Sequence, residues 1–321
     1  MKNLNYKECV KLANQGDAEA SYQLGCHYLK NYNNDALSWL NKSAGKGYIK
    51  AQILLGWIYK EGKFTKPNYT EAVFWYEKAA IKNNIRAQYE LGRLYRKGGW
   101  GIRKNNKKSY LWIKKAASQG HERVQCELGY MYDNGIGIKK DLEQAYYWYK
   151  QSANQGNSKA QHSIGFAYHK GKAVEQNFKC ALYWYIKSAK QSNSYGQYAL
   201  GLMREQGNAC KQSYYKALNW YEKSAKQENH NANNKLGEIF YKGLGIEQNN
   251  NMAFDYFYKA VEQGNEWTQY HLGVMYLDGT GNEHNAYKGA EYIRKATSNK
   301  NEALSNKAKK IWKERKLEQF I

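Results

Sequence analysis

The chain has 321 residues and carries 50 Lys and Arg against 28 Asp and Glu, so its formal net charge is +22. A charge of this size either attracts anionic partners or only keeps a lysine-rich surface soluble. No stretch approaches the roughly 20 apolar residues of a membrane-spanning helix, and one proline with no Ser/Gly-rich tract gives no sign of a flexible linker.

The start of the chain and its cysteines bear on the cellular compartment. Residues 1–16 are mostly polar where a signal peptide would need an apolar core. The five cysteines are odd in number and share no repeated position, which predicts reduced thiols instead of a disulfide framework. We therefore expect a cytoplasmic protein, although export by a signal-independent route would leave no mark in the sequence.

One glycine position returns along nearly the whole chain at an almost fixed interval. Its copies are separated by 31, 36, 37, 36, 36, 36 and 36 residues and lie at Gly25, Gly56, Gly92, Gly129, Gly165, Gly201, Gly237 and Gly273. An aromatic residue keeps the same register, at Trp39, Trp75, Trp112, Trp148, Trp184, Trp220, Tyr256 and Tyr292. This period is typical of a stacked solenoid, in which each unit buries its apolar face only against its neighbours.

In chain order, the sequence predicts a single domain over residues 1–321. It comprises a capping helix in 1–17, eight repeats in 18–298 and a second capping helix in 299–321. Each repeat should be two helices joined by a turn. In the first helix the repeat glycine marks a contact too close for a side chain. Gly135 predicts a left-handed helix stop and Asp141 an N-cap. The second helix is expected to bury a stripe of Ala145, Trp148, Ser152 and Ala153.

These units resemble the Sel-1-like repeat (SLR) family, a relative of the tetratricopeptide repeats with a slightly longer unit. The matching motifs are AQ-x3-G at residues 51–56, 87–92 and 160–165, a G-x-G turn at 135–137 and 243–245, and A-x2-W-Y-x-K/Q-x-A/S-A at 72–80, 145–153, 181–189 and 217–225. The resemblance covers about residues 4–297 and implies an all-α, right-handed α-solenoid of about eight repeats with capping helices at both ends. The fifth and sixth copies depart from the pattern, with Ala173 and Ala209 in place of the second turn glycine.

The resemblance also implies a binding groove, because the first helices line the concave side of SLR and tetratricopeptide folds. Positions −6, −3, +1 and +4 from the repeat glycine lie opposite the buried face. The residues predicted to bind a partner there are Lys50, Trp57, Arg86, Tyr89, Arg93, Arg96, Arg123, Tyr130, Lys159, His162 and Phe166. Guanidinium forks suit carboxylates and phosphates, and aromatic residues dominate binding hot spots. We expect Arg86, Arg93, Arg96 and Arg123 to be the anion contacts.

A dense run of positive charge lies beside this groove. Between Leu91 and His121 there are nine Lys or Arg and no Asp or Glu, and the third copy carries an extra loop residue near Trp100. The basic edge of this run comprises Arg103, Lys104, Lys107 and Lys108. Such a run is either a solvated loop or an extension of the groove's positive field towards an acidic partner.

The sequence predicts no catalytic, metal or cofactor site. Ser43 and Lys46 match the S-x-x-K string of penicillin-recognising enzymes, but other copies read SAKQ or SANQ there and the partner motifs are missing. His162 and His169 lie seven residues apart without a nearby Cys or carboxylate to complete a metal set. We expect no enzyme activity, no cofactor and no small-molecule substrate.

Two functions fit these features. The first is a protein–protein interaction scaffold or adaptor whose basic, aromatic groove binds an acidic segment of another protein. Adaptor roles in signalling, envelope processes and host interaction are what the family resemblance implies. The alternative is a nucleic-acid-binding solenoid that tracks phosphates with its groove and basic edge while bases stack on tyrosines.

Overall fold

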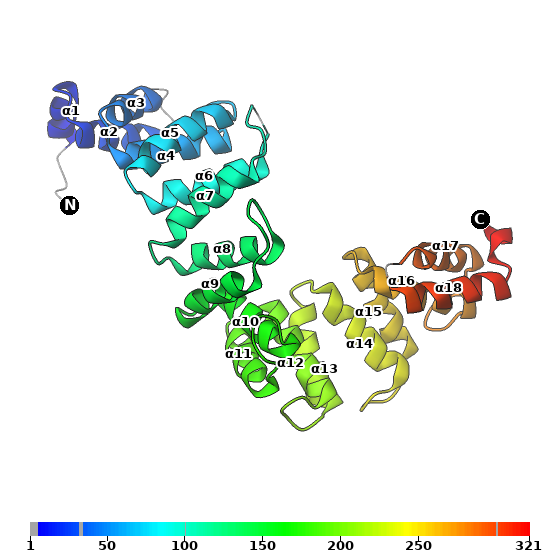
Figure 1. Cartoon of the computed structure of the whole chain (residues 1–321). Coiled ribbons are helices and arrows are strands. Elements are labelled where there is room, and N and C mark those ends of the chain that lie inside the picture. Colours follow the sequence, from blue (N-terminus) through cyan, green and yellow to red (C-terminus); the bar gives the residue numbers. More distant parts are fainter. Residues whose placement is uncertain (1–5, 32–34, 100, 300) are drawn as a thin grey trace. The chain divides into compact units, whose positions relative to one another are not determined.

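The structure is a computed structural model, and it describes residues 6–31, 35–99, 101–299 and 301–321 (Figure 1). The regular elements in these ranges are α- and 3₁₀-helices, with one isolated antiparallel bridge between Gly99 and Ile102. None of these helices is both long and apolar enough to cross a membrane. The chain divides into two compact units, residues 1–155 and 156–321, which are described separately.

The first unit contains α1 and four helix pairs, α2/α3, α4/α5, α6/α7 and α8/α9. We call the first member of each pair helix A and the second helix B. The bounds are α1 Tyr6–Asn14, α2 Ala18–Lys30, α3 Ala36–Gly45, α4 Ile49–Glu61, α5 Tyr69–Ile81, α6 Ile85–Lys97, α7 Asn106–Ala117, α8 Glu122–Asn134 and α9 Leu142–Asn154. Helix α1 buries Cys9 and Ala13 against Leu24 of α2, so it covers the apolar end of the first pair.

The second unit also contains four pairs, α10/α11, α12/α13, α14/α15 and α16/α17. The bounds are α10 Ser158–Lys170, α11 Phe178–Lys190, α12 Ser194–Gln206, α13 Tyr214–Ala225, α14 His230–Lys242, α15 Asn250–Glu262, η1 Glu266–Thr268, α16 Gln269–Asp278, α17 Ala286–Thr297, α18 Glu302–Glu314 and η2 Leu317–Phe320. Ala308 of α18 and Leu317 of η2 pack on Ile293 of α17 and cover the last pair. The predicted all-helical repeat fold with capping helices is confirmed.

The repeat glycine lies where helix B crosses helix A. A Cβ atom on Gly165 would lie 2.6 Å from the ring of Tyr185, and one on Gly201 would lie 2.5 Å from the ring of Tyr221. Both tyrosines are at most 2% exposed. Glycine inside a helix costs about 1 kcal/mol relative to alanine, but here it lets a whole ring enter the core. The predicted close contact is confirmed.

The predicted stripe on helix B is right except for its aromatic residue. Ala145, Ser152 and Ala153 are buried, whereas Trp148 is half-buried and the next residue, Tyr149, packs against the repeat glycine of its own pair. The tryptophan position instead connects neighbouring repeats. Trp75 of α5 belongs to an apolar cluster with Leu55 of its own pair and with Leu40 and Ala44 of the preceding pair. The sequence pattern gave both aromatics helical spacing but could not tell which one meets the glycine.

Repeated polar residues hold the helix ends in place. The Asp141 carboxylate accepts a hydrogen bond from the Gln144 amide at 2.9 Å, so the predicted N-cap is confirmed. The serine near the end of helix B donates to a carbonyl in the first turn of helix A in four pairs: Ser43 to Ala18, Ser152 to Glu122, Ser188 to Ser158, and Ser224 to Ser194, at 2.6–2.7 Å. Ser43 is fully buried in this role, so its S-x-x-K string reflects helix packing.

The turns between helices A and B require left-handed backbone. Gly135 and Gly137 have φ of 67° and 74°, as the sequence predicted for the helix stop. Ala173 and Ala209 keep the same conformation without glycine, at φ 61° and 55°. An L-residue in this region is strained by roughly 1–2 kcal/mol. The substituted turns therefore preserve the geometry of the repeat at a cost in stability.

Replacing either alanine with glycine should stabilise the protein. For Ala173→Gly and Ala209→Gly we expect gains of roughly 0.5–1 kcal/mol each, because relief of the strain exceeds the added entropy of the unfolded chain. The matched control is Gly137→Ala, whose Cβ would lie 1.9 Å from the Asn106 carbonyl oxygen and should destabilise the protein. Urea unfolding followed by circular dichroism measures all three. A loss of stability in Ala173→Gly would contradict the prediction.

Candidate functional site

The A helices of the first unit present the predicted groove positions at the surface. Lys50, Arg86, Arg93, Arg123 and Tyr130 are exposed, and the three half-buried members are Trp57, Tyr89 and Arg96. Adjacent positions on the same helices, such as Ala51, Leu55, Ala87 and Leu91, are buried. We call the surface formed by these eight predicted residues the A-helix face of the first unit.

A hollow of about 330 Å³ opens on this face between α2, α4 and α6. Its lining is Tyr22, Lys50, Ile53, Leu54, Trp57 and Arg86, and we call it the Trp57 hollow. The four residues from α4 follow one another at spacings of three, one and three, so one helical stripe forms most of the floor. Burial and a hydrogen bond to Cys26 raise the pKa of Tyr22 to about 12, so its phenol is neutral.

The two cations of the Trp57 hollow are uncompensated. No carboxylate lines the hollow, and neither Lys50 nor Arg86 pairs with an acidic side chain among the described residues. The ammonium of Lys50 lies 5.9 Å from the ring of Tyr48. The hollow therefore combines an apolar, aromatic floor with two positive charges available to an incoming anion.

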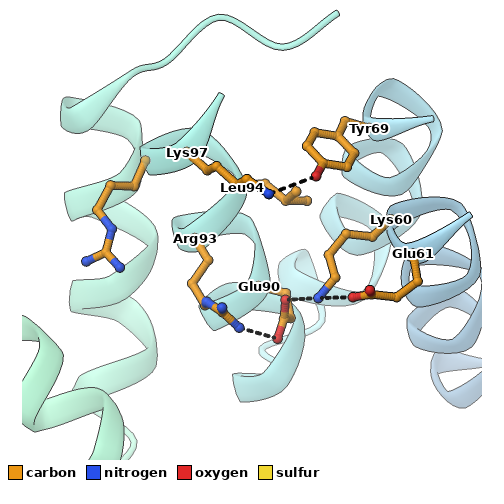
Figure 2. Close-up of a pocket in the computed structure, with 8 residues that line it drawn as sticks. Lys60, Glu61, Tyr69, Glu90, Arg93, Leu94 and Lys97 are labelled. Carbon is orange, nitrogen blue, oxygen red and sulfur yellow. Dashed lines mark hydrogen bonds and ion pairs between the residues drawn. The ribbon is translucent and has the colours of Figure 1, made fainter. Parts of the chain in front are cut away.

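A second hollow, of about 440 Å³, is lined by four cations and two carboxylates, and three of the cations already have carboxylate partners in the chain (Figure 2). Its lining is Lys60, Glu61, Tyr69, Glu90, Arg93, Leu94, Arg96 and Lys97, and we call it the Glu90 hollow. Lys60 Nζ lies 2.9 Å from Glu90 and 3.0 Å from Glu61. Burial alone would lower the pKa of Lys60, but the two carboxylates outweigh it and the pKa is raised.

Two of the predicted arginines have carboxylate partners within the chain. Arg96 of α6 pairs with Glu127 of α8, and Arg93 lies 3.6 Å from Glu90. Arg86 and Arg123 form no ion pair among the described residues. That the four arginines contact an anion of a partner stays a prediction. The sequence contained a signal for the ion pairs between neighbouring A helices. Position +4 of one repeat faces position −2 of the next, as in Lys60–Glu90 and Arg96–Glu127.

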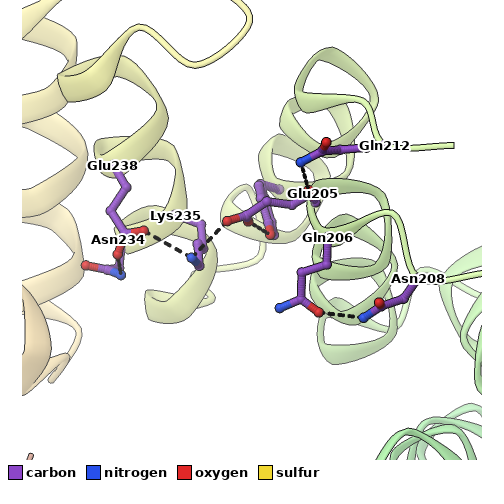
Figure 3. A network of polar contacts seen from close by, with 8 residues as sticks. Glu205, Gln206, Asn208, Gln212, Asn234, Lys235 and Glu238 are labelled. Carbon is purple, nitrogen blue, oxygen red and sulfur yellow. Dashed lines mark hydrogen bonds and ion pairs between the residues drawn. The ribbon is translucent and has the colours of Figure 1, made fainter. Parts of the chain in front are cut away.

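The second unit repeats this pairing with reversed polarity (Figure 3). Glu205 at position +4 lies 3.1 Å from Lys235 at position −2, and Lys235 lies 3.0 Å from Glu238. Tyr221 donates its hydroxyl to Glu205, while burial followed by the nearby Glu205 charge raises the pKa of Tyr221 and keeps it protonated. This network is satisfied internally. It was not predicted from the sequence, because each A helix was considered by itself and ion pairs between neighbouring A helices were not sought.

The three predicted groove residues of α10 belong to the second unit. Lys159 and Phe166 are exposed there. His162 is half-buried, with its ring centroid 5.7 Å from that of Tyr185 and 5.8 Å from that of Tyr195. Burial lowers the pKa of His162 to about 4, so the imidazole is neutral at physiological pH and adds no positive charge to the surface.

The basic edge is exposed at all four of its predicted residues. Arg103 and Lys104 follow the Gly99–Ile102 bridge, and Lys107 and Lys108 lie in the first turn of α7. Cations in a first turn oppose the helix dipole, so their placement costs a few tenths of a kcal/mol. The predicted extra residue near Trp100 lies outside the described residues. In the part of the chain that the structure describes, no group of His, Cys, Asp or Glu could hold a metal ion.

This arrangement defines a helical-repeat protein with charged and aromatic side chains on its A helices. The Sel1 repeat matches residues 49–84, 85–121, 123–157, 158–193, 194–229, 230–265 and 268–301. The chain therefore belongs to the Sel1 repeat family. Sel1 repeat proteins generally serve as non-enzymatic interaction scaffolds.

Solved structures agree with this assignment. A protective antigen of uropathogenic Escherichia coli strains, which has an SLR fold, is 31% identical over 97% of this chain and 68% of its own, with a TM-score of 0.78. A Sel1 repeat protein from Oxalobacter formigenes is 28% identical over 95% of this chain and 89% of its own, with a TM-score of 0.76. The comparison with curated proteins finds no match.

Reversing one member of the Arg96–Glu127 pair should weaken the contact between α6 and α8. We expect Arg96→Glu to lower the free energy of unfolding by about 1 kcal/mol, because two carboxylates would face each other in a partly exposed site. The double variant Arg96→Glu/Glu127→Arg should restore most of the loss. Thermal unfolding of the three proteins measures this. Additive losses in the double variant would rule out a direct pairing.

The half-buried His162 should make the stability of the protein depend on pH. The unfolded state protonates His162 near pH 6.5, whereas the folded state holds its pKa at about 4, so stability rises with pH across this window and falls on acidification. The shifted pKa of His162 changes the free energy of unfolding by at most about 3 kcal/mol over this pH window. We expect His162→Phe to reduce the pH dependence of the urea midpoint between pH 7 and 4. The exposed His284→Phe is the control and should leave that dependence intact.

Proposed function

We propose that this Sel1 repeat protein is a non-enzymatic scaffold whose A-helix face in residues 1–155 binds an acidic segment of another protein. The observation that carries the proposal is the Trp57 hollow, in which Lys50 and Arg86 stand uncompensated beside an apolar floor. Since both cations would remain in water without a partner, an incoming carboxylate gains charge-assisted hydrogen bonds without displacing an internal one.

The chemistry of the hollow also constrains the bound segment. The Arg86 fork favours a carboxylate held by two parallel hydrogen bonds, while Lys50 offers a point charge for a second acidic group. Ile53, Leu54 and Trp57 offer contact to an apolar side chain between them. We therefore infer a segment in which Asp or Glu residues flank an aliphatic or aromatic residue. The Glu90 hollow attracts an acidic segment less strongly, because Lys60 and Arg93 already lie against the Glu90 carboxylate.

The aromatic residues of this face favour a protein over nucleic acid. The ammonium of Lys63 lies 5.0 Å from the ring centroid of Trp57, and the guanidinium of Arg93 lies 5.8 Å from that of Tyr89. A base stacks on an open ring face, and here cations of the same chain already occupy positions over these rings. Binding to nucleic acid is therefore the alternative outcome of the experiment below.

Affinity capture from nuclease-treated native lysate should identify the partner, and the acidic segment is then titrated as a synthetic peptide. Lys50→Gln/Arg86→Gln should weaken peptide binding at least tenfold, since each charge-assisted hydrogen bond contributes about 1.5–3 kcal/mol. Replacing the peptide's Asp and Glu by Asn and Gln should have a similar effect. Lys66→Gln/Lys139→Gln, which removes the same charge at exposed positions of the same unit, is the matched control.

Two results would overturn the proposal. Unchanged affinity of the Lys50→Gln/Arg86→Gln variant would exclude the Trp57 hollow as the binding site. Capture that disappears with nuclease, together with oligonucleotide binding that falls steeply as salt rises, would assign the face to nucleic acid.

A further inference from the structure

A second exposed surface of the first unit lies on its B helices. The residue before the repeated aromatic points outward in three of them, with Phe74 47%, Leu111 56% and Tyr147 50% exposed. Ile81 lies seven residues after Phe74 on the same stripe of α5 and is 78% exposed. Large apolar side chains exposed together at equivalent positions mark an interaction surface more often than single ones do.

Helices α5 and α7 contact the same apolar cluster beneath this surface. Trp112 of α7 packs against the apolar cluster that Tyr76, Ala79 and Ala80 of α5 build with α6. A Cβ on Gly101, in the loop before α7, would lie 2.9 Å from the Thr70 hydroxyl of α5. The outward residues of the two helices are Phe74, Lys78, Ile81, Lys107, Lys108, Leu111, Lys114 and Lys115, and we call them the outer patch.

The lysines of the outer patch carry unpaired positive charge. All five are exposed, and among the described residues none forms an ion pair. Lys78 lies over the ring of Phe74 at 4.8 Å, and Lys115 over the ring of Trp112 at 4.8 Å, so their stems lie along apolar surface while the ammonium groups stay in water. Glu77, nearby on α5, accepts a hydrogen bond from the Tyr95 hydroxyl at 2.9 Å.

We propose that the outer patch of α5 and α7 binds the surface of an anionic lipid bilayer, with Phe74, Ile81 and Leu111 inserted at the headgroup level and the lysines over lipid phosphates and carboxylates. This inference goes beyond the binding of an acidic segment, and it concerns different helices. Amphipathic surfaces with apolar side chains between lysines are typical of peripheral membrane contacts, where each lysine near an anionic leaflet contributes about 1 kcal/mol.

The residue types separate this partner from the other anionic ones. Four of the five cations of the A-helix face are arginines, whose planar fork pairs with an individual carboxylate. The cations of the outer patch are all lysines, which are point charges suited to a diffuse field. Ile81 and Leu111 have no ring to stack on a base, so they contribute little to nucleic-acid binding. A bilayer accepts protruding aliphatic side chains without needing a matching cavity. Its anionic headgroups also complement the charge of the lysines.

Vesicle co-sedimentation of the full chain tests the proposal, using phosphatidylcholine vesicles with and without phosphatidylserine. We expect binding only when phosphatidylserine is present, and weaker binding as salt rises. Lys114→Gln/Lys115→Gln should weaken it about thirtyfold, because each lysine contributes a factor of roughly five. Ile81→Gln/Leu111→Gln keeps the charge and should weaken binding tenfold or more through lost apolar insertion.

Matched variants in the second unit are the controls. Lys211→Gln/Lys216→Gln removes the same charge and Tyr287→Gln the same kind of exposed apolar side chain, and neither should change vesicle binding. Equal losses of vesicle binding in Lys114→Gln/Lys115→Gln and Lys211→Gln/Lys216→Gln would show that binding depends only on the net charge of the protein, and would overturn the proposal. So would normal vesicle binding by Ile81→Gln/Leu111→Gln, or binding to random oligonucleotides without binding to vesicles.

The two surfaces can be tested independently of each other. Lys50→Gln/Arg86→Gln should bind vesicles normally, while the outer-patch variants should bind the acidic peptide normally. Loss of both activities in one set of variants, with helical content unchanged, would show that the two ligands share a surface and would contradict the separation proposed here.

Discussion

The contact between a glycine of helix A and a large side chain of helix B, a ring in five of the eight pairs and Leu or Ile in the other three, is the constraint on which the rest of this structure depends. In the second unit Gly165, Gly201 and Gly237 each meet a ring at a distance that leaves no space for a methyl group. The contact fixes how closely the two helices of a pair approach and which side of each is buried. The opposite sides, which carry the cations and the exposed aromatic residues, are therefore set by a packing rule at the core.

Much of this fold could be predicted from the sequence because its determinants are local and recur. Period, helix caps and turn glycines each depend on a few adjacent residues, and the AQ-x3-G and W-Y motifs repeat them often enough to be unambiguous. The choice between Trp148 and Tyr149 was not predictable in this way. Both lie on the inner half of the helix, and only the crossing of the partner helix decides which one is covered.

For the candidate site, the sequence predicted which single helix positions are exposed, but it did not predict which side chains of neighbouring helices contact each other. Helical spacing placed Arg96 on a solvent-facing stripe, but its partner Glu127 lies on the next A helix, and spacing within one helix contains no information about that neighbour. The outer patch was missed for a related reason. Phe74 and Leu111 each precede the repeated aromatic residue in the sequence, so the pattern suggests that they belong to the core. In the structure they lie on the exposed side of the helix.

The reversal of the ionic contacts between repeats has a consequence for how such a chain can change in evolution. Tandem repeats are readily lost or gained by recombination between equivalent segments, and most features of this chain would survive it because each of the eight pairs supplies the repeat glycine and a large side chain that packs on it. A deletion that joined the helix of Arg96 directly to the helix of Lys235 would, however, set two cations against each other at the seam. The repeats are thus alike in their cores and different in the ion pairs between neighbouring A helices. Their order in the chain is therefore not interchangeable.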